Sequence, residues 1–571
     1  MGGTQVHYEI FSRKTPVAGW SLCGAMEDRA QALAAAHEMM TGGKVAAVKV
    51  HKESLNPDSG EYQSLAILTL GAAQPAKAKK IQESQEPLCV SPQDLYSLHA
   101  RDRIGRLLEA WLERKGATAF ELLHRADLVE QLEASGTDLQ HAIQKVSIPE
   151  AQARGLTVHE LIRSFQALVE RAIERLIRDT RRGAMPDLDK EGFAKAVERV
   201  AQDPERSYLL GAGVAVSIAP ARNWSDKIGR LLDLIDAAPG AGPARALAFQ
   251  VIEQPLAEIV GSRLGLNDLL GRELELGARL AAMTRLAAIG PVESLMAVEA
   301  SVSSIMPPMG IPAQRLAERL ADEDFASVKS ALAKRVVQEL TGPRRLCPGD
   351  PGAEIAVMRA LAMALTAAAG TLIPLEDVQN AFVTRSQMLV TSDFVETYLG
   401  SGRGGPRGDV DALIWLTENV IGGANKRAAG RFLAAQIKAM RLESDLRDGK
   451  DSPAQKLQTL ATWQRAVARG GLAPEDFGPM QAQLGELGGR VEADSRLVSL
   501  VTSAPAGLAQ RLVLLLRLAI GETAPLGPAA DRARVEALKM ARLDETRTEL
   551  AGQPERMAQV RDLLSAVSAA A

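Results

Sequence analysis

Residues 157–182 read T-V-H-E-L-I-R-S-F-Q-A-L-V-E-R-A-I-E-R-L-I-R-D-T-R-R. The apolar positions in this stretch recur every three or four residues, with charged residues between them. They are Leu161, Phe165, Leu168, Ala172 and Leu176. This spacing places the apolar side chains on one face of an α-helix, whose period is 3.6 residues. The stretch therefore predicts a long amphipathic helix that buries one face against neighbouring helices.

The same periodicity recurs through most of the chain after residue 93. It predicts a mainly α protein with a large multi-helix body, arranged as a bundle or as an irregular helical array. Further helices are expected at residues 226–237, 244–262, 267–288, 312–321, 325–341, 352–371, 375–388, 409–421, 425–447, 453–469, 505–520, 529–551 and 554–569. Proline and glycine separate most of them. We divide this body into three helical subdomains, which span residues 93–239, 240–400 and 401–571.

The first 72 residues have a different pattern, which predicts a small α+β module. Short runs that alternate apolar and polar residues, bounded by turn residues, are typical of strands. The expected order is strand, strand, helix, strand and strand, at residues 6–12, 20–23, 27–40, 44–53 and 62–70. Residues 73–92 are rich in proline and lysine and predict a linker between this ββαββ module and the helical body.

The charge balance limits the classes of partner. The 571-residue chain carries 67 Lys and Arg against 70 Asp and Glu, so its formal net charge is −3. Nucleic-acid-binding proteins usually have a strongly basic domain, and bases stack on exposed aromatic residues. All aromatic residues together make up only 4% of this chain. The Arg-rich helix end at residues 178–182 is an alternative nucleic-acid surface, but the net charge disfavours it.

Cysteine usage and hydropathy bear on the compartment. Cys23, Cys89 and Cys347 are too few and too scattered for a disulfide framework, which favours a reducing compartment. The N-terminus lacks the basic and apolar regions of a signal peptide. Residues 208–220 and 360–375 are uncharged but fall short of the roughly 20 residues that a membrane-spanning helix needs. We therefore expect a cytoplasmic protein with no membrane insertion and with both segments buried.

The best candidate for ligand chemistry is the glycine-rich stretch at residues 400–409, G-S-G-R-G-G-P-R-G-D. A helix is expected to begin near Asp409, and the backbone N–H groups at a helix N-terminus attract anions. The predicted anion site comprises Gly402, Arg403, Gly405, Arg407 and Gly408. The stretch lacks the Gly-Lys-Ser/Thr ending of a phosphate-binding loop, so a mobile surface loop is the alternative interpretation.

Other candidates each have a plainer alternative. Arg344 and Arg345 beside Cys347 predict a thiol with a lowered pKa, but no histidine lies near as a base, and a rigid connection between helices is the alternative. Residues 187–198 space carboxylates nearly as a calcium-binding loop does, whereas an acidic first turn of a helix is the simpler interpretation. No cofactor and no metal site are predicted, because no Cys/His pair has metal-ligand spacing.

Two short stretches nearly match. Residues 102–109 read D-R-I-G-R-L-L-E and residues 226–233 read D-K-I-G-R-L-L-D. Glycine inside a helix costs up to about 1 kcal/mol relative to alanine, so Gly105 and Gly229 are each expected to let another helix approach closely. A duplicated helical unit and a coincidence in a Leu- and Arg-rich sequence both remain open.

These observations favour a non-enzymatic regulatory or scaffold protein. The helical body and the tethered module would bind protein partners, with self-association as one form of this. No arrangement of residues in the sequence matches a known catalytic motif, so no catalytic residue is predicted. The alternative is a helical enzyme, or a nucleotide- or anion-binding protein, that uses residues 400–409.

Overall fold

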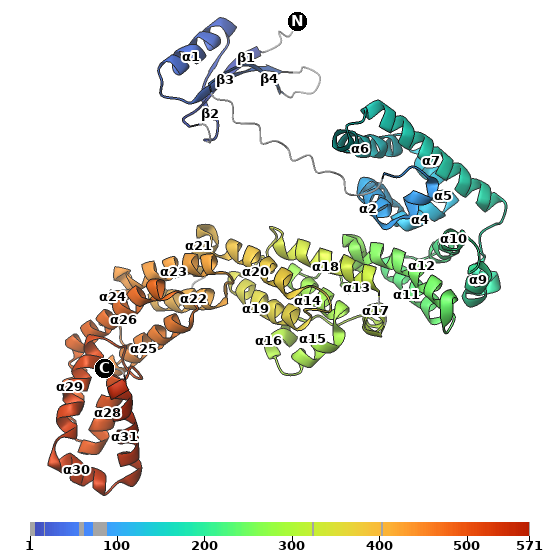
Figure 1. The fold of residues 1–571 in the computed structure, drawn as a ribbon. Coiled ribbons are helices and arrows are strands. Elements are labelled where there is room, and N and C mark those ends of the chain that lie inside the picture. Colours follow the sequence, from blue (N-terminus) through green and yellow to red (C-terminus); the bar gives the residue numbers. More distant parts are fainter. Residues whose placement is uncertain are drawn as a thin grey trace. The chain divides into compact units, whose positions relative to one another are not determined.

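The computed structural model describes residues 6–15, 18–55, 62–71, 88–322, 325–400 and 404–569. The structure is 73% helix, with 31 α-helices in this described part and a four-stranded antiparallel sheet near the N-terminus (Figure 1). The predicted fold class, a mainly α protein with an N-terminal ββαββ module, is therefore confirmed. The chain divides into two compact units. They are Met1–Val90 with Gln140–Leu168, and Ser91–Leu139 with Val169–Ala571.

The N-terminal sheet has the strand order β2-β1-β3-β4, and each neighbouring pair is antiparallel. Its elements are β1 (Val6–Arg13), β2 (Ser21–Met26), α1 (Arg29–Thr41), β3 (Ala47–Leu55) and β4 (Tyr62–Gly71). Ile10 of β1 pairs with Val50 of β3, and both are buried against Ala32 and Ala36 of α1. The alternation in the strands thus supplies the apolar face on which the helix packs. Of the predicted linker at residues 73–92, residues 73–87 lie outside the described part.

The helical body begins with a short 3-10 helix, η1 (Pro92–Tyr96). The next helices are α2 (Leu98–Leu107), α3 (Glu109–Lys115), α4 (Ala119–His124), α5 (Ala126–Ala134), α6 (Thr137–Arg154), α7 (Val158–Arg181), α8 (Leu188–Glu191) and α9 (Phe193–Val200). The middle helices are α10 (Arg206–Ile218), α11 (Trp224–Asp236), α12 (Gly242–Gly261), α13 (Arg263–Leu270), α14 (Leu276–Ala287), α15 (Ile289–Met296), α16 (Ala300–Ile305), α17 (Ile311–Asp322), α18 (Ala326–Thr341), α19 (Pro351–Ala367), α20 (Leu375–Leu389) and α21 (Ser392–Gly400). The last helices are α22 (Gly405–Asn419), α23 (Gly423–Ile437), α24 (Met440–Asp448), α25 (Pro453–Arg469), α26 (Pro474–Ser495), α27 (Leu497–Ser503), α28 (Leu508–Ala519), α29 (Pro528–Ala541), α30 (Asp544–Ala551) and α31 (Pro554–Ala569).

Helices of the second unit pack mainly on helices that are near them in the chain (Figure 1). For example, α14 contacts α17, α18 and α19, α25 contacts α26, and α28 contacts α29 and α31. One continuous core of buried apolar residues extends from Phe120 to Val567. Each helix therefore buries its apolar stripe against its neighbours, as the helical periodicity requires. The division of this body into three subdomains stays a prediction.

Three predicted helices are each interrupted in the structure. The predicted helix at residues 267–288 breaks at Gly271, whose φ of 120° is a conformation that favours glycine. The predicted helices at residues 425–447 and 529–551 break at Ala439 and Leu543, which adopt extended backbone before α24 and α30 begin. Neither residue is a glycine or a proline, so the sequence carries no break signal at these points.

The expectation for the two matching stretches is wrong at both glycines. A Cβ atom placed on Gly105 would lie 3.9 Å from the Cβ of Ala119, which is ordinary van der Waals contact. One placed on Gly229 would meet nothing within 4 Å. Neither glycine is therefore needed for close helix packing, and the packing offers no support for a duplicated unit.

Close packing does require glycine in α26, where residues 525–528 cross it. A Cβ on Gly488 would lie 2.3 Å from Cγ of Pro525, and one on Gly485 would lie 2.4 Å from the carbonyl oxygen of Leu526. The side chain of Gln464 in α25 holds this crossing segment, because its amide accepts from Leu526 N–H (2.7 Å) and donates to the Leu526 carbonyl (2.9 Å).

We expect Gly488→Ala to lower the free energy of unfolding by about 1–3 kcal/mol, because the added methyl overlaps Pro525. Gly478→Ala in the same helix is the matched control. A Cβ at Gly478 meets nothing within 4 Å, so this variant should gain up to about 1 kcal/mol from helix propensity. Chemical denaturation measures both. Equal effects of the two substitutions would contradict this account of the packing.

His124 is buried in α4 (4% exposed) among aromatic rings. Its Nδ1 donates to the Phe120 carbonyl (2.7 Å), and its ring centroid lies 5.0 Å from that of Tyr96. Gly211 of α10 makes room for the imidazole, because a Cβ there would lie 2.5 Å from Nε2. Burial lowers the pKa of His124 to about 4, the Phe120 carbonyl opposes this shift, and the Arg101 cation adds to it.

This histidine should make stability depend on pH. At pH values above about 6.5 the imidazole is neutral in both states, so its contribution is complete. Between pH 6.5 and about pH 4, His124 is protonated in the unfolded chain but stays neutral in the folded protein. The free energy of unfolding therefore falls by on the order of 3 kcal/mol over that pH range. Denaturation of the His124→Phe variant between pH 4 and 7 should show a shallower loss. An unchanged slope would contradict this assignment.

Candidate interaction surface

One exposed stretch of the second unit is almost without charge. Residues 294–313 read S-L-M-A-V-E-A-S-V-S-S-I-M-P-P-M-G-I-P-A, and Glu299 is the single charged residue among these twenty. The stretch spans the end of α15, all of α16 and the start of α17. Surface segments of soluble proteins usually carry charge, so this composition needs an explanation.

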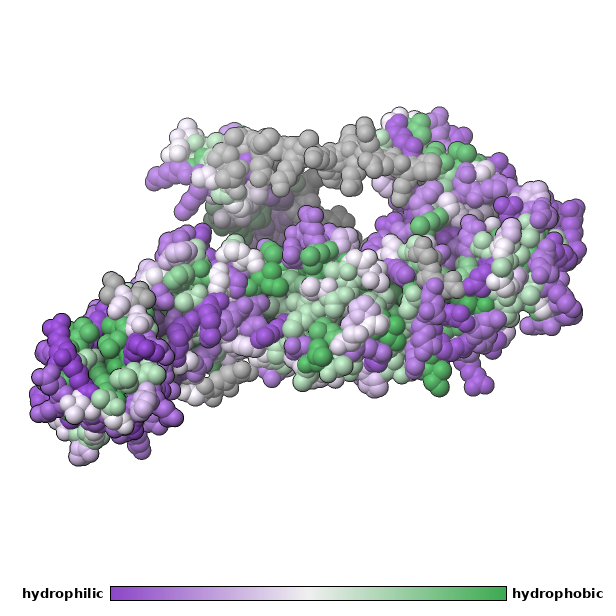
Figure 2. Space-filling view, turned by 60° about the horizontal axis from the view of Figure 1, so that its bottom comes forward, coloured by the Kyte–Doolittle hydropathy of each residue, from purple (hydrophilic) through white to green (hydrophobic). Residues whose placement is uncertain are grey.

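The stretch exposes large apolar side chains. Val298 is 77% exposed and Ile311 is 76% exposed, and among the described residues only Met440 is a more exposed large hydrophobic residue, at 87%. Met306 and Met309 lie half-buried between them in sequence. In the view of Figure 2, hydrophobic residues gather over the middle helices of the array, where Figure 1 labels α14, α15, α16 and α19.

α16 is held in place through one face. Val302 is fully buried against Ala360 and Ala364, which lie one turn apart on α19. Small alanine side chains let the two helices approach closely. Met296 and Met363 pack around this contact. One side of α16 is thus fixed to α19, while the segment on either side of it remains open to solvent.

This arrangement suits binding of an apolar surface rather than catalysis. Exposed apolar patches on soluble proteins mark interaction sites, and methionine side chains adapt to partners of different shape because they are unbranched and polarisable. We call residues 294–313 together with Met363 the methionine-rich surface. This surface was not predicted from the sequence, although the low charge of residues 294–313 is visible there.

The loop at residues 342–350 is fixed by a buried ion pair. Glu354 of α19 (1% exposed) accepts the N–H groups of Leu346 (2.9 Å) and Cys347 (2.7 Å). Arg385 of α20 (fully buried) donates to the same carboxylate (2.8 Å) and to the Gly342 carbonyl (3.1 Å). This pair connects α18, α19 and α20.

The structure contradicts the predicted lowering of the Cys347 pKa. The pKa of this thiol is raised to about 12, chiefly by burial and in addition by the carboxylates of Glu275 and Glu354. Arg344 pairs instead with Glu339 (3.8 Å), and the Arg345 guanidinium lies over the Phe394 ring (5.5 Å). The neighbouring arginines in the sequence are thus directed away from the thiol.

The acidic stretch at residues 187–198 forms helix caps and ion pairs. Asp187 caps α8 by accepting from Lys190 N–H (3.2 Å) and pairs with the Lys190 ammonium (2.7 Å). Glu191 pairs with Arg199 (2.7 Å). Hydrogen bonding to these cations lowers the pKa of both carboxyls. Among the described residues, no group of three or more His, Cys, Asp or Glu side chains is placed to hold a metal ion.

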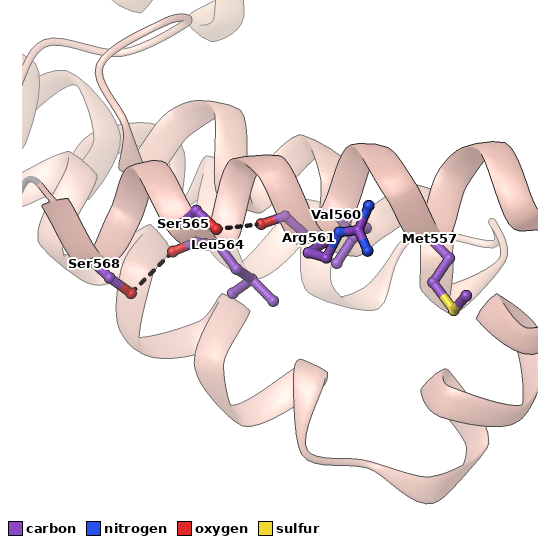
Figure 3. Close-up of a pocket in the computed structure, with 6 residues that line it drawn as sticks. All are labelled: Met557, Val560, Arg561, Leu564, Ser565 and Ser568. Carbon is purple, nitrogen blue, oxygen red and sulfur yellow. Dashed lines mark hydrogen bonds between the residues drawn. The ribbon is translucent and has the colours of Figure 1, made fainter.

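Two grooves lie in the C-terminal helices. The larger, about 560 Å³, lies between α27 and α29, and the Glu492–Arg532 ion pair (2.5 Å) lines it. The smaller, about 350 Å³, runs along α31 (Figure 3). Two of its lining residues, Ser565 and Ser568, donate to carbonyls of their own helix (both 3.0 Å), which occupies their hydroxyl hydrogens. The acidic residues Asp531 and Glu536 of the larger groove pair with Arg534 and Lys539. Arg561 of the smaller groove is exposed and forms no ion pair with the described residues, but no second charged residue lines that groove.

The face of the N-terminal sheet opposite α1 carries a small aromatic and cationic cluster. The Lys49 ammonium lies over the rings of Phe11 (4.9 Å) and Trp20 (5.1 Å), and the Arg13 guanidinium lies 4.9 Å from the Trp20 centroid. Trp20 is 36% exposed. Docking of a partner to this module stays a prediction.

The glycine-rich stretch differs from expectation in where its helix begins. Gly402 and Arg403 lie outside the described residues, and α22 begins at Gly405 rather than near Asp409. Gly405 and Gly408 therefore lie in the first turn of α22. A Cβ at Gly405 would meet nothing within 4 Å, so no neighbouring group fills the space beside it.

Near the start of α22, carboxylates pair with Arg407 and with Arg441. Arg407 donates to the Asp445 carboxylate (2.6 Å), to the Asp445 carbonyl (2.9 Å) and to Asp451. Asp409 is buried and accepts from Arg441 (2.8 Å). The positive charge of Arg407 is therefore already matched by two carboxylates, which leaves little of it for a ligand. The anion site itself stays a prediction.

We expect Arg407→Ala to lower the free energy of unfolding by about 1 kcal/mol, since it removes a charge-assisted link between α22 and α24. The measurement is chemical denaturation, together with the thermal shift that inorganic phosphate produces. The phosphate shift should be the same in the variant and in the wild type. A reduced phosphate shift with unchanged stability would instead support the predicted anion site.

No helix among the described residues is long and apolar enough to cross a membrane. Comparison of the chain with family models, with curated proteins and with solved structures gave no match in any of the three.

Proposed function

We propose that the protein is a non-enzymatic scaffold or regulatory protein whose helical body binds an amphipathic helix of a partner protein on the methionine-rich surface. The observation that carries the proposal is the exposure of Val298 and Ile311 within a twenty-residue stretch that holds one charge. Leaving these side chains in water forgoes the roughly 1.5–3 kcal/mol that burial of each would contribute.

The architecture supports this assignment. Arrays of stacked helices offer extended surfaces, and each helix is already held by its neighbours, so a partner meets a preformed face. Val302 anchors α16 to α19 through a fully buried contact, which keeps this face rigid at its centre. The methionines beside it supply adaptable contact, a combination found where helices are bound in apolar grooves.

The chemistry of the surface indicates the kind of partner. A surface with one carboxylate in twenty residues cannot select its partner by charge pairing, so apolar contact has to supply the affinity. An amphipathic helix presents apolar anchors at positions i, i+3, i+4 and i+7, which match a short apolar face of this kind. An extended strand would need an open sheet edge, and this stretch consists of helix, turn and coil without a strand.

We expect the Val298→Glu and Ile311→Glu double variant to lose its partner while keeping its stability, because both side chains are about three quarters exposed. Met440→Glu is the matched control. Met440 is 87% exposed on α24, whose neighbouring residues are mostly charged. The measurement is photo-crosslinking in the native cytosol from residue analogues at positions 298, 311 and 440, with mass spectrometry of the adducts.

One protein attached at both 298 and 311, and not at 440, would support the proposal. With the analogue placed at position 309 instead, the same protein should disappear from the Val298→Glu and Ile311→Glu double variant and persist in Met440→Glu. Attachment of a second copy of this chain at 298 would assign the surface to self-association and overturn the partner-helix proposal. Adduct yields at 298 no higher than at 440 would remove its basis.

A further inference from the structure

Arg279 of α14 is a buried cation with too few hydrogen-bond partners. The residue is 6% exposed, and its Nη2 donates to the Leu274 carbonyl (2.9 Å). Its Nε and Nη1 have no hydrogen-bond partner. It is the only residue in the described part of the chain with two buried side-chain atoms in this condition.

Such an arrangement is costly unless something else satisfies it. Buried polar groups in proteins are nearly always hydrogen-bonded, and a buried charge without a counter-charge is among the most unfavourable of groups. In the unfolded chain, water accepts hydrogen bonds from the guanidinium. A guanidinium that is buried without acceptors loses these hydrogen bonds on folding. Nε and Nη1 of Arg279 therefore lack a hydrogen-bond acceptor within the fold, and a bound ligand would satisfy them.

Three further arginines from different parts of the chain are near enough to Arg279 for their charges to lower its pKa. They are Arg263 at the start of α13, Arg335 on α18, and Arg344 in the loop that follows α18. α14 packs against both α13 and α18. The N–H of Gly277 also donates to the Leu346 carbonyl (3.1 Å), which fixes the Arg344 loop against α14.

The charges in this cluster do not balance. Glu339 is the carboxylate of the group, and it is shared between Arg335 (2.5 Å) and Arg344 (3.8 Å). Burial lowers the pKa of Arg279, and Arg344 lowers it next, with Glu339 acting in the opposite direction. Four guanidinium groups and one carboxylate leave a local excess of positive charge, and the Arg344 side chain is 50% exposed, so part of this charge is accessible from solvent.

We propose that Arg263, Arg279, Arg335 and Arg344 form a binding site for a phosphate-type oxyanion. A tetrahedral oxyanion presents several acceptor oxygens, and the guanidinium group offers N–H donors in a planar fork that matches them. Nε and Nη1 of Arg279 donate to the anion, and Arg263, Arg335 and the half-exposed Arg344 supply the remaining positive charge. This site is independent of the methionine-rich surface.

The site has a specific consequence for the protein without ligand. A buried guanidinium that lacks an acceptor opposes folding, so its replacement by an apolar side chain of similar length should not destabilise the fold. Arg279→Met is therefore expected to melt at the same temperature as the wild type or above it in chloride buffer. Inorganic phosphate should raise the melting temperature of the wild type in a concentration-dependent way.

The test measures the melting temperature and the calorimetric affinity of the full chain for inorganic phosphate, with ionic strength held constant by chloride. Arg279→Met should abolish the phosphate response, and Arg344→Gln should weaken affinity at least tenfold. Arg272→Gln is the control, because Arg272 is 71% exposed and pairs with Asp268 (2.6 Å) while the net charge changes equally. It should respond as the wild type does.

Three results would overturn the site. The first is a wild-type chain that shows no phosphate effect beyond that of chloride at equal ionic strength. The second is an Arg279→Met variant that keeps the wild-type phosphate response. The third is an Arg279→Met variant that melts several degrees lower than the wild type without phosphate. The last result would mean that the guanidinium already has its partners within the fold.

Discussion

The middle of the helical array depends on one buried carboxylate, that of Glu354. It receives two backbone N–H groups and the guanidinium of Arg385, and both side chains are removed from water. Pairs of this kind contribute little net stability compared with apolar packing, but loss of one partner leaves a buried charge and costs about 3–5 kcal/mol. The loop after α18 is consequently held in one conformation. That loop carries Arg344 and brings it toward α14, so the arginine cluster follows from the placement of Glu354.

Periodicity in the sequence predicted the fold class and most of the helices, since an apolar stripe with a 3.6-residue repeat has few other uses. The ββαββ module was predicted from the two-residue alternation of apolar and polar residues in its strands. The ends of helices were harder to predict from the sequence. α24 and α30 restart after single extended residues, Ala439 and Leu543, because the core continues across the break, and local composition does not record this. The helices α15 and α16, whose apolar segments are short, were not among the predicted ranges, and neither were α10, α21 and the 22-residue α26.

The candidate sites were predicted less well than the fold, for a physical reason. Arginines next to Cys347 suggested an activated thiol, but sequence neighbours on a loop point in different directions, and the thiol faces carboxylates. The arginines near Arg279 are spread over about eighty positions, from Arg263 to Arg344, so no local sequence motif indicates their proximity. Arg407 looked available in the sequence, and its two aspartates lie about forty residues away. Pairing of charges is decided by the fold, whereas a run of uncharged residues such as 294–313 can be read directly.

Because each helix packs mainly on helices close to it in the chain, the array should fold and unfold locally. Contacts between nearby elements close short loops, so little chain entropy is lost each time a helix docks, and ordering can spread from any well-packed segment. By the same logic, the last helices can fray without melting those before them, because few of their contacts reach far back along the chain. Although the core is continuous from Phe120 to Val567, neighbouring groups of helices can therefore unfold and refold one after another without opening the whole core.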